Sequence, residues 1–132
     1  MKFPLLVLFG LVSLGSHAQT QASHPQQAST TYQRADQELN RTYQQVLREC
    51  RANPAFLAKL KVAQQRWLQF RDAELQARYP DANPLVAYGS SYPECSATVL
   101  ETLTKARTQQ LRLWLTGIPE GDVCTGSVKM TK

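Results

Sequence analysis

The stretch from Asn53 to Tyr79 constrains the fold more than any other part of the sequence, because it carries the longest helical pattern. Asn53 can accept hydrogen bonds from the first free amides of a helix, and Pro54 suits the first helical position. Apolar side chains then recur every three or four residues, at Phe56, Leu60, Ala63, Trp67 and Phe70. This spacing predicts a helix with one buried face.

Two other segments have the same kind of apolar periodicity, at about residues 30–50 and 94–116. Thr30 or Thr31 can open the first segment, and Gly117 can end the second. In a chain of 132 residues, three amphipathic helices are enough to enclose one hydrophobic core. We therefore predict an all-α fold, in which the helices form an antiparallel three-helix bundle.

The segments around these helices lack apolar periodicity. Residues 19–29 are rich in Gln, Ser and Ala and are predicted to form a flexible leader before the helical domain at residues 30–118. Residues 80–94 are predicted to form a long loop between the second and third helices, and connections of this length often carry function. Residues 119–132 are expected to form an irregular C-terminal tail.

The second half of the long loop has the composition of a contact surface. A glycine allows close approach of the backbone to a partner, and tyrosines and serines give adaptable contacts. The candidate partner-binding loop consists of Tyr88, Gly89, Ser90, Ser91 and Tyr92. The alternative is a helix connector made of ordinary turn residues.

Residues 1–18 have the three parts of a secretory signal peptide. Lys2 precedes an apolar run at residues 3–14, and small residues at positions 16 and 18 fit cleavage by signal peptidase. The apolar run is shorter than the roughly 20 residues that a membrane-spanning helix needs. We therefore expect a cleaved signal peptide, a periplasmic or secreted protein, and a mature form without a transmembrane span.

Two arginines interrupt the apolar faces of the helices. Arg71 lies one turn beyond Trp67, and Arg107 lies between apolar positions of the third helix. In an up-down-up bundle with a rise of about 1.5 Å per residue, both reach the level of Asp36 and Asn40. Because a buried cation needs a partner, we predict a polar layer inside the bundle formed by Asp36, Asn40, Arg71, Thr104 and Arg107. Alternatively, each arginine extends to the surface and is hydrated independently.

The chain contains three cysteines, Cys50, Cys95 and Cys124. An oxidising compartment favours one disulfide and leaves one thiol over. Cys50 ends the first predicted helix and Cys124 follows the third, and in an up-down-up bundle these two helix ends lie on the same side. A disulfide between them is therefore geometrically reasonable if their Cα atoms are close. The protein is then a monomer, or a disulfide-linked dimer through Cys95.

Histidine is nearly absent: His17 and His24 both precede the predicted helical domain. The folded region therefore lacks a histidine for a metal cluster or a Ser-His-Asp set, and it has no glycine-rich phosphate loop. We expect no enzymatic activity, no cofactor and no metal. The formal net charge of +5 is modest and spread along the helices, so nucleic acid is not an expected partner.

Several short motifs occur in a distinctive order. They are Asp36-Gln37-Glu38-Leu39-Asn40 with Tyr43, Gln64 or Gln65 with Trp67, Phe70-Arg71-Asp72-Ala73-Glu74, Gly89-Ser90, and Leu103-Thr104 with Arg107 and Leu111. Together they resemble the LprI-like lysozyme-inhibitor N-terminal domain family over about residues 30–115. The resemblance implies a small helical domain of the cell envelope, with inhibition of lysozyme as its activity. Where many relatives have a pair of cysteines, this chain has Leu75 and Val99, which implies that a family disulfide is replaced here by apolar residues.

Two functions are therefore open. The first is non-covalent inhibition of a lysozyme-type muramidase, although a basic chain would be repelled by a strongly basic lysozyme. The second is a non-enzymatic envelope protein that binds another envelope protein or an anionic cell-wall or lipopolysaccharide surface. In the second function, a basic helix face with Lys59, Lys61 and Arg66 would bind the partner or the anionic surface. The alternative is that these side chains are hydrated and bind nothing.

Overall fold

The computed structural model describes residues 23–121 and 123–131, and it is almost entirely helical in this part of the chain. The helices are α1 (Ser23–Glu49), α2 (Pro54–Arg78), α3 (Pro84–Tyr88) and α4 (Tyr92–Thr116), and the strands are β1 (Ile118–Pro119) and β2 (Met130–Thr131). The all-α class expected from the sequence is confirmed. The predicted signal peptide and the first part of the predicted leader lie outside the described residues.

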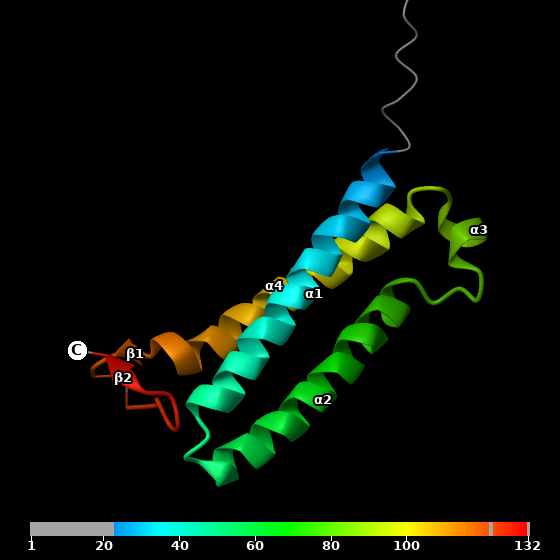
Figure 1. Ribbon diagram of the computed structural model, residues 1–132. Helices are drawn as coiled ribbons and strands as arrows, with labels where there is room; N and C mark the ends of the chain where they lie inside the picture. Colours follow the sequence, from blue (N-terminus) through cyan, green and yellow to red (C-terminus); the bar gives the residue numbers. More distant parts are fainter. Residues whose placement is uncertain (1–22, 122, 132) are drawn as a thin grey trace, which may run out of the picture.

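Helices α1 and α4 form the main packing pair and lie side by side (Figure 1). Near its start, α1 is joined to α4 by a hydrogen bond from Thr31 to Glu101, and further along by an ion pair between Glu38 and Arg112. Residue numbers rise together along both helices at these contacts, so α1 and α4 run in the same direction.

Helix α2 makes fewer contacts and lies mainly against α4. The ring of Phe56 stacks on that of Trp114 with centroids 5.5 Å apart, and Gln64 accepts a hydrogen bond from Arg107. Residue numbers rise along α2 as they fall along α4, so these two helices run in opposite directions. Figure 1 shows α2 returning along the other two long helices toward α3.

The hydrophobic core lies where the three long helices meet. Leu39 and Val46 from α1, Leu60 from α2 and Leu111 from α4 are buried, and both tryptophans pack against them. The other buried side chains of these two helices are mostly small, namely Ala35 and Thr42 on α1 and Ala97, Thr104 and Thr108 on α4. Because small side chains let two helix axes approach, this composition explains why α4 packs more closely on α1 than on α2.

The boundaries of α2 agree with the sequence pattern. The Asn53 side chain accepts a hydrogen bond from the backbone amide of Phe56, as an N-cap should, and Pro54 is the first helical residue. The last long helix also ends as expected: Gly117 has φ +83° and its amide donates to the carbonyl of Leu113.

The start of α1 differs from the expectation. The helix begins at Ser23, so the described part of the predicted flexible leader is helical rather than flexible. The Thr30 and Thr31 hydroxyls do not cap the helix, because they donate back to the carbonyls of Gln26 and Ala28 within it.

Two segments expected to be irregular contain short regular elements. The long loop includes α3, which begins at the N-cap Asn83 and ends at Gly89, with φ +75°. In the C-terminal tail, β1 pairs with β2 in parallel, with Ile118 opposite Met130. Figure 1 shows α3 and this tail at opposite ends of the molecule.

Candidate functional site

The guanidinium of Arg71 joins α2 to α1. Its Nη1 lies 3.2 Å from Oδ1 of Asp36, and its Nε donates to Oδ1 of Asp72 at 2.9 Å. Asn40 donates from Nδ2 to the other oxygen of Asp36 at 3.2 Å. Burial lowers the pKa of Arg71, but the hydrogen bond to Asp72 and the nearby acids outweigh that effect, and the pKa is raised. The structure thus brings three members of the predicted polar layer together.

Trp67 links this group to the second arginine. The Cζ atoms of Arg71 and Arg107 lie 5.5 Å and 6.0 Å from the centroid of its ring system, and Arg71 also lies 5.9 Å from the ring of Tyr32. A guanidinium at this distance from an aromatic face gains a favourable cation–π interaction. Burial raises the pKa of the Tyr32 hydroxyl.

Arg107 has amide partners instead of a carboxylate. Its Nε donates to Oε1 of the buried Gln64 at 3.0 Å, and its Nη1 donates to Oε1 of Gln110 at 3.1 Å. Burial lowers the pKa of the Arg107 guanidinium. No ion pair between Arg107 and Asp36 exists among the described residues, so the predicted layer consists of two groups connected through Trp67.

Thr104 lies in the interior, but it does not join either group. Its side chain is fully buried, and its hydroxyl has no hydrogen-bond partner among the described residues. The backbone carbonyl of Thr104 accepts a hydrogen bond from the Thr108 hydroxyl. The sequence prediction omitted Gln64, although its position one turn after Leu60 and just before Trp67 places it on the buried face of α2.

The candidate partner-binding loop is held by three tyrosines. The ring of Tyr79 meets those of Tyr88 and Tyr92 edge-on, with centroids 5.2 Å and 5.1 Å apart. The two end residues of the loop therefore pack on the last turn of α2. Between them, Gly89, Ser90 and Ser91 are exposed.

The short helix before this loop exposes apolar side chains. Leu85 is 54% exposed and Val86 is 79% exposed, and Tyr88 is partly exposed beside them. We call these three residues the α3 tip. Leu85 and Val86 are neighbours on one short helix, so the α3 tip is a local exposed apolar surface and a candidate for contact with a partner.

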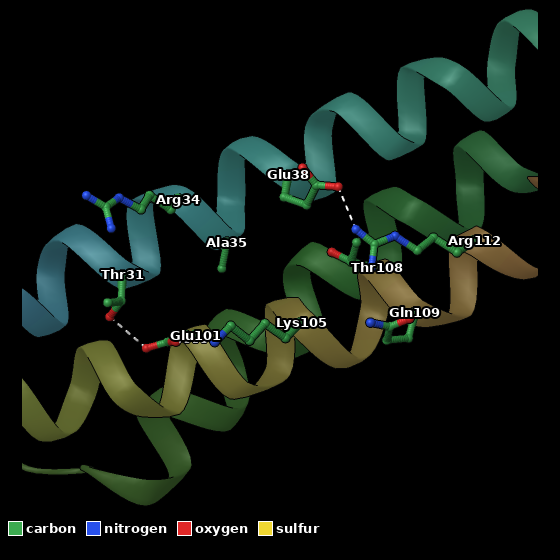
Figure 2. A pocket seen from close by; sticks show the side chains of 9 residues that line it. All are labelled: Thr31, Arg34, Ala35, Glu38, Glu101, Lys105, Thr108, Gln109 and Arg112. Carbon is green, nitrogen blue, oxygen red and sulfur yellow. Dashed lines mark hydrogen bonds and ion pairs between the residues drawn. The ribbon is translucent and has the colours of Figure 1, made fainter.

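A groove of about 360 Å³ lies between α1 and α4 (Figure 2). Glu38 is paired with Arg112 across it at 2.6 Å, and Glu101 accepts from Thr31 at 2.8 Å and pairs with Lys105. The remaining lining residues are Arg34, Ala35, Thr108 and Gln109.

The carboxylates of this groove are not suited to acid catalysis. Hydrogen bonds from Arg41 and Arg112 lower the pKa of Glu38, and hydrogen bonds from Lys105 and Thr31 lower that of Glu101. Both groups are therefore ionised at neutral pH, whereas a general acid needs a raised pKa. Glu38 and Glu101 instead hold α1 and α4 together, through Arg112 and Thr31 respectively.

The predicted disulfide is not observed. Cys50 is half-buried in the turn after α1 and packs against the hydrophobic core, and the structure does not place it in a disulfide. Cys124 lies on an exposed part of the C-terminal tail, and Cys95 is exposed in the first turn of α4. Leu75 and Val99 are both half-buried.

The described residues offer neither a metal-binding cluster nor a membrane-spanning helix. Residues 23–121 and 123–131 contain no group of three His, Cys, Asp or Glu side chains that could hold a metal ion. Within the same residues, every helix is too short or too polar to cross a bilayer.

Comparison with known proteins gives one match. Searches of curated proteins and of solved structures returned no significant similarity. A family model described as "Lysozyme inhibitor LprI" matches residues 15–111, which include every residue of the polar layer and of the candidate partner-binding loop. The match spans well over half of the sequence, and the chain therefore belongs to the LprI lysozyme-inhibitor family.

Proposed function

We propose that this protein is exported to the periplasm or beyond and inhibits a lysozyme-type muramidase by binding it non-covalently. The observation that carries the proposal is the family match over residues 15–111, since the family is described by this activity. The carboxylates of the groove hold α1 and α4 together and lack the raised pKa that a general acid needs.

The candidate partner-binding loop, Tyr88 to Tyr92, is the element that we assign to the contact. Muramidases cleave their substrate in a cleft that carries two carboxyl groups, so an inhibitor has to cover or enter a concave surface. The exposed backbone and hydroxyl groups from Gly89 to Ser91 offer hydrogen bonds to such a cleft. The contacts of Tyr79 hold both ends of the loop before binding, which reduces the entropy lost on association.

In this proposal the three long helices act as one antiparallel bundle that supports the loop. The contact of Arg71 with Asp36 and the hydrogen bond of Arg107 to Gln64 set the position of α2 relative to α1 and α4. Because α2 leads directly to Tyr79, its position determines where the loop stands.

A turbidity assay tests this function. The mature chain at micromolar concentration is expected to slow the lysis of cell walls by a purified lysozyme. Ser90→Trp places a bulky side chain in the exposed loop and should weaken inhibition, whereas Gln44→Trp on the exposed side of α1 should leave it unchanged. Lysis at the uninhibited rate with wild-type protein would refute the proposal.

A second candidate is the binding of an envelope protein or an anionic envelope surface. Lys59 and Lys61 are exposed and form no ion pair among the described residues, and Arg66 contacts only the neutral Gln69. Salt-sensitive retention on purified envelope fractions would support this function. Equal retention by wild-type protein and by a Lys59→Gln/Lys61→Gln variant would count against it.

A further inference from the structure

We propose that the α3 tip docks on the muramidase together with the adjoining candidate partner-binding loop and that it selects a basic partner with an apolar concave surface. This inference rests on the proposed function and specifies the partner's chemistry. Figure 1 shows α3, which carries the three residues of the tip, at one end of the molecule, between the end of α2 and the start of α4. A partner that covers Leu85 and Val86 removes their apolar surface from water, and this burial favours binding.

The charge around the tip is acidic although the whole chain is basic. From Tyr79 to Thr104 the sequence contains no Lys or Arg, while Asp81 and Glu94 flank α3 on either side. The nearest cation along the chain, Arg78, lies in the last turn of α2 and lines a pocket between α2 and α4 together with Glu74. An approaching partner therefore meets an apolar surface that is flanked by the carboxylates of Asp81 and Glu94, with Arg78 as the cation at its border.

Arg78 lies beside this surface, but the lysines of α2 are too far from it to affect its field. Lys61 precedes the last residue of α2 by a distance of about 25 Å along the helix axis, and Lys59 lies further still. At physiological salt, charge interactions are screened over about 8 Å. A basic lysozyme that docks on α3 is therefore attracted by Asp81 and Glu94, and the net charge of +5 does not prevent association.

The α3 tip is held in a shape that suits docking. The Asn83 side chain caps the helix by accepting a hydrogen bond from the backbone amide of Val86. The backbone amide of Asn83 donates to Oδ1 of Asp81 at 2.9 Å. At the other end, the positive φ of Gly89 lets the chain turn, so that Tyr88 can pack on Tyr79. The exposed face of α3 is thus ordered without a partner, which favours rapid and specific association.

Binding kinetics of a purified, strongly basic lysozyme on immobilised mature protein test the inference. The Asp81→Asn/Glu94→Gln variant keeps the shape of the rim and removes its charge; it should reduce the association rate constant about fivefold at an ionic strength of about 0.02 M and less than about twofold at about 0.5 M. The matched control, Glu49→Gln/Glu120→Gln, changes the net charge equally at the opposite end and should have little effect.

The Leu85→Ser/Val86→Ser variant tests the apolar part. It should weaken affinity about tenfold or more, chiefly through faster dissociation, while its thermal unfolding stays like that of wild type because both side chains are exposed. If wild-type protein inhibits lysozyme but both α3 variants behave like the control, the inference is wrong and the proposed function stands. If the serine variant instead abolishes self-association of the free protein, the tip binds a second copy and the inference is wrong. Absence of any lysozyme binding by the wild-type chain overturns both the inference and the proposed function.

Discussion

The ion pair between Asp36 and Arg71 provides the sharpest test of the internal polar network. Removing the carboxylate in Asp36→Ala leaves Arg71, whose side chain is only 11% exposed, with Asp72 as its remaining acidic partner. It also removes the acceptor for the Asn40 side chain. The substitution should therefore destabilise the protein.

The size of the effect follows from the exposure of the two partners. A fully buried pair that loses one member costs about 3–5 kcal/mol, and an exposed pair costs about 0.2–1 kcal/mol. The Asp36 side chain is 38% exposed and Arg71 keeps its bond to Asp72, so the pair lies between these cases. We expect a loss of about 1.5 kcal/mol in the free energy of unfolding for Asp36→Ala.

Urea denaturation at neutral pH measures this loss, provided that the slope against denaturant is unchanged. Asp72→Ala is the matched control: Asp72 also bonds Arg71, but its side chain is 58% exposed, so its removal should cost less than about 1 kcal/mol. A loss below about 0.5 kcal/mol for Asp36→Ala, or a greater loss for Asp72→Ala, would show that the contact between α1 and α2 does not stabilise the fold.

Three further predictions concern buried and paired groups. Gln64→Ala should destabilise the protein by about 1–3 kcal/mol in urea, because it strands the half-buried Arg107; a neutral result would mean that water replaces the amide. Thr104→Val should be neutral or stabilising by about 1 kcal/mol, since the buried hydroxyl has no partner among the described residues, whereas Thr108→Val removes a hydrogen bond and should destabilise. Hydrogen bonds from its lysine and threonine neighbours hold the pKa of Glu101 below its ordinary value of 4.5, so its contribution to stability is present above that pH and is lost as the pH falls through the folded-state pKa. Unfolding measured between about pH 5 and pH 3 should therefore depend less on pH in Glu101→Gln, and an unchanged pH profile would refute this account.

The sequence predicted the long helices well where local chemistry determines their ends. Asn53 and Gly117 act as caps as expected, because a side-chain acceptor and a residue free to adopt positive φ satisfy backbone groups without help from the rest of the fold. The predicted start of α1 was wrong because the Thr30 hydroxyl can form two kinds of hydrogen bond. It can cap the start of a helix, or it can donate to a carbonyl within the helix, as it does here. Sequence pattern alone does not distinguish these two states.

The candidate site was only partly predictable for a related reason. The helical rise per residue predicted that Asp36 and Arg71 lie at the same level of the bundle, and the two side chains form an ion pair. The partner of Arg107 depends on the rotation of α2 about its axis, which helical periodicity fixes too coarsely to choose between Asp36 and Gln64. Likewise, α3 could not be foreseen from periodicity, because a helix of five residues contains too few positions to show one.

Helix α2 connects the internal polar network with the α3 tip. The first half of α2 packs through apolar side chains such as Phe56 and Leu60, but beyond Gln64 its contacts are made largely by Trp67 and the two arginines beside it. Cation–π and hydrogen-bond contacts are directional, so they fix the rotation of α2 more tightly than aliphatic packing does. The helix ends beside Tyr79, on which the loop after α3 is anchored. Residues inside the bundle therefore set the position of a surface that they do not touch.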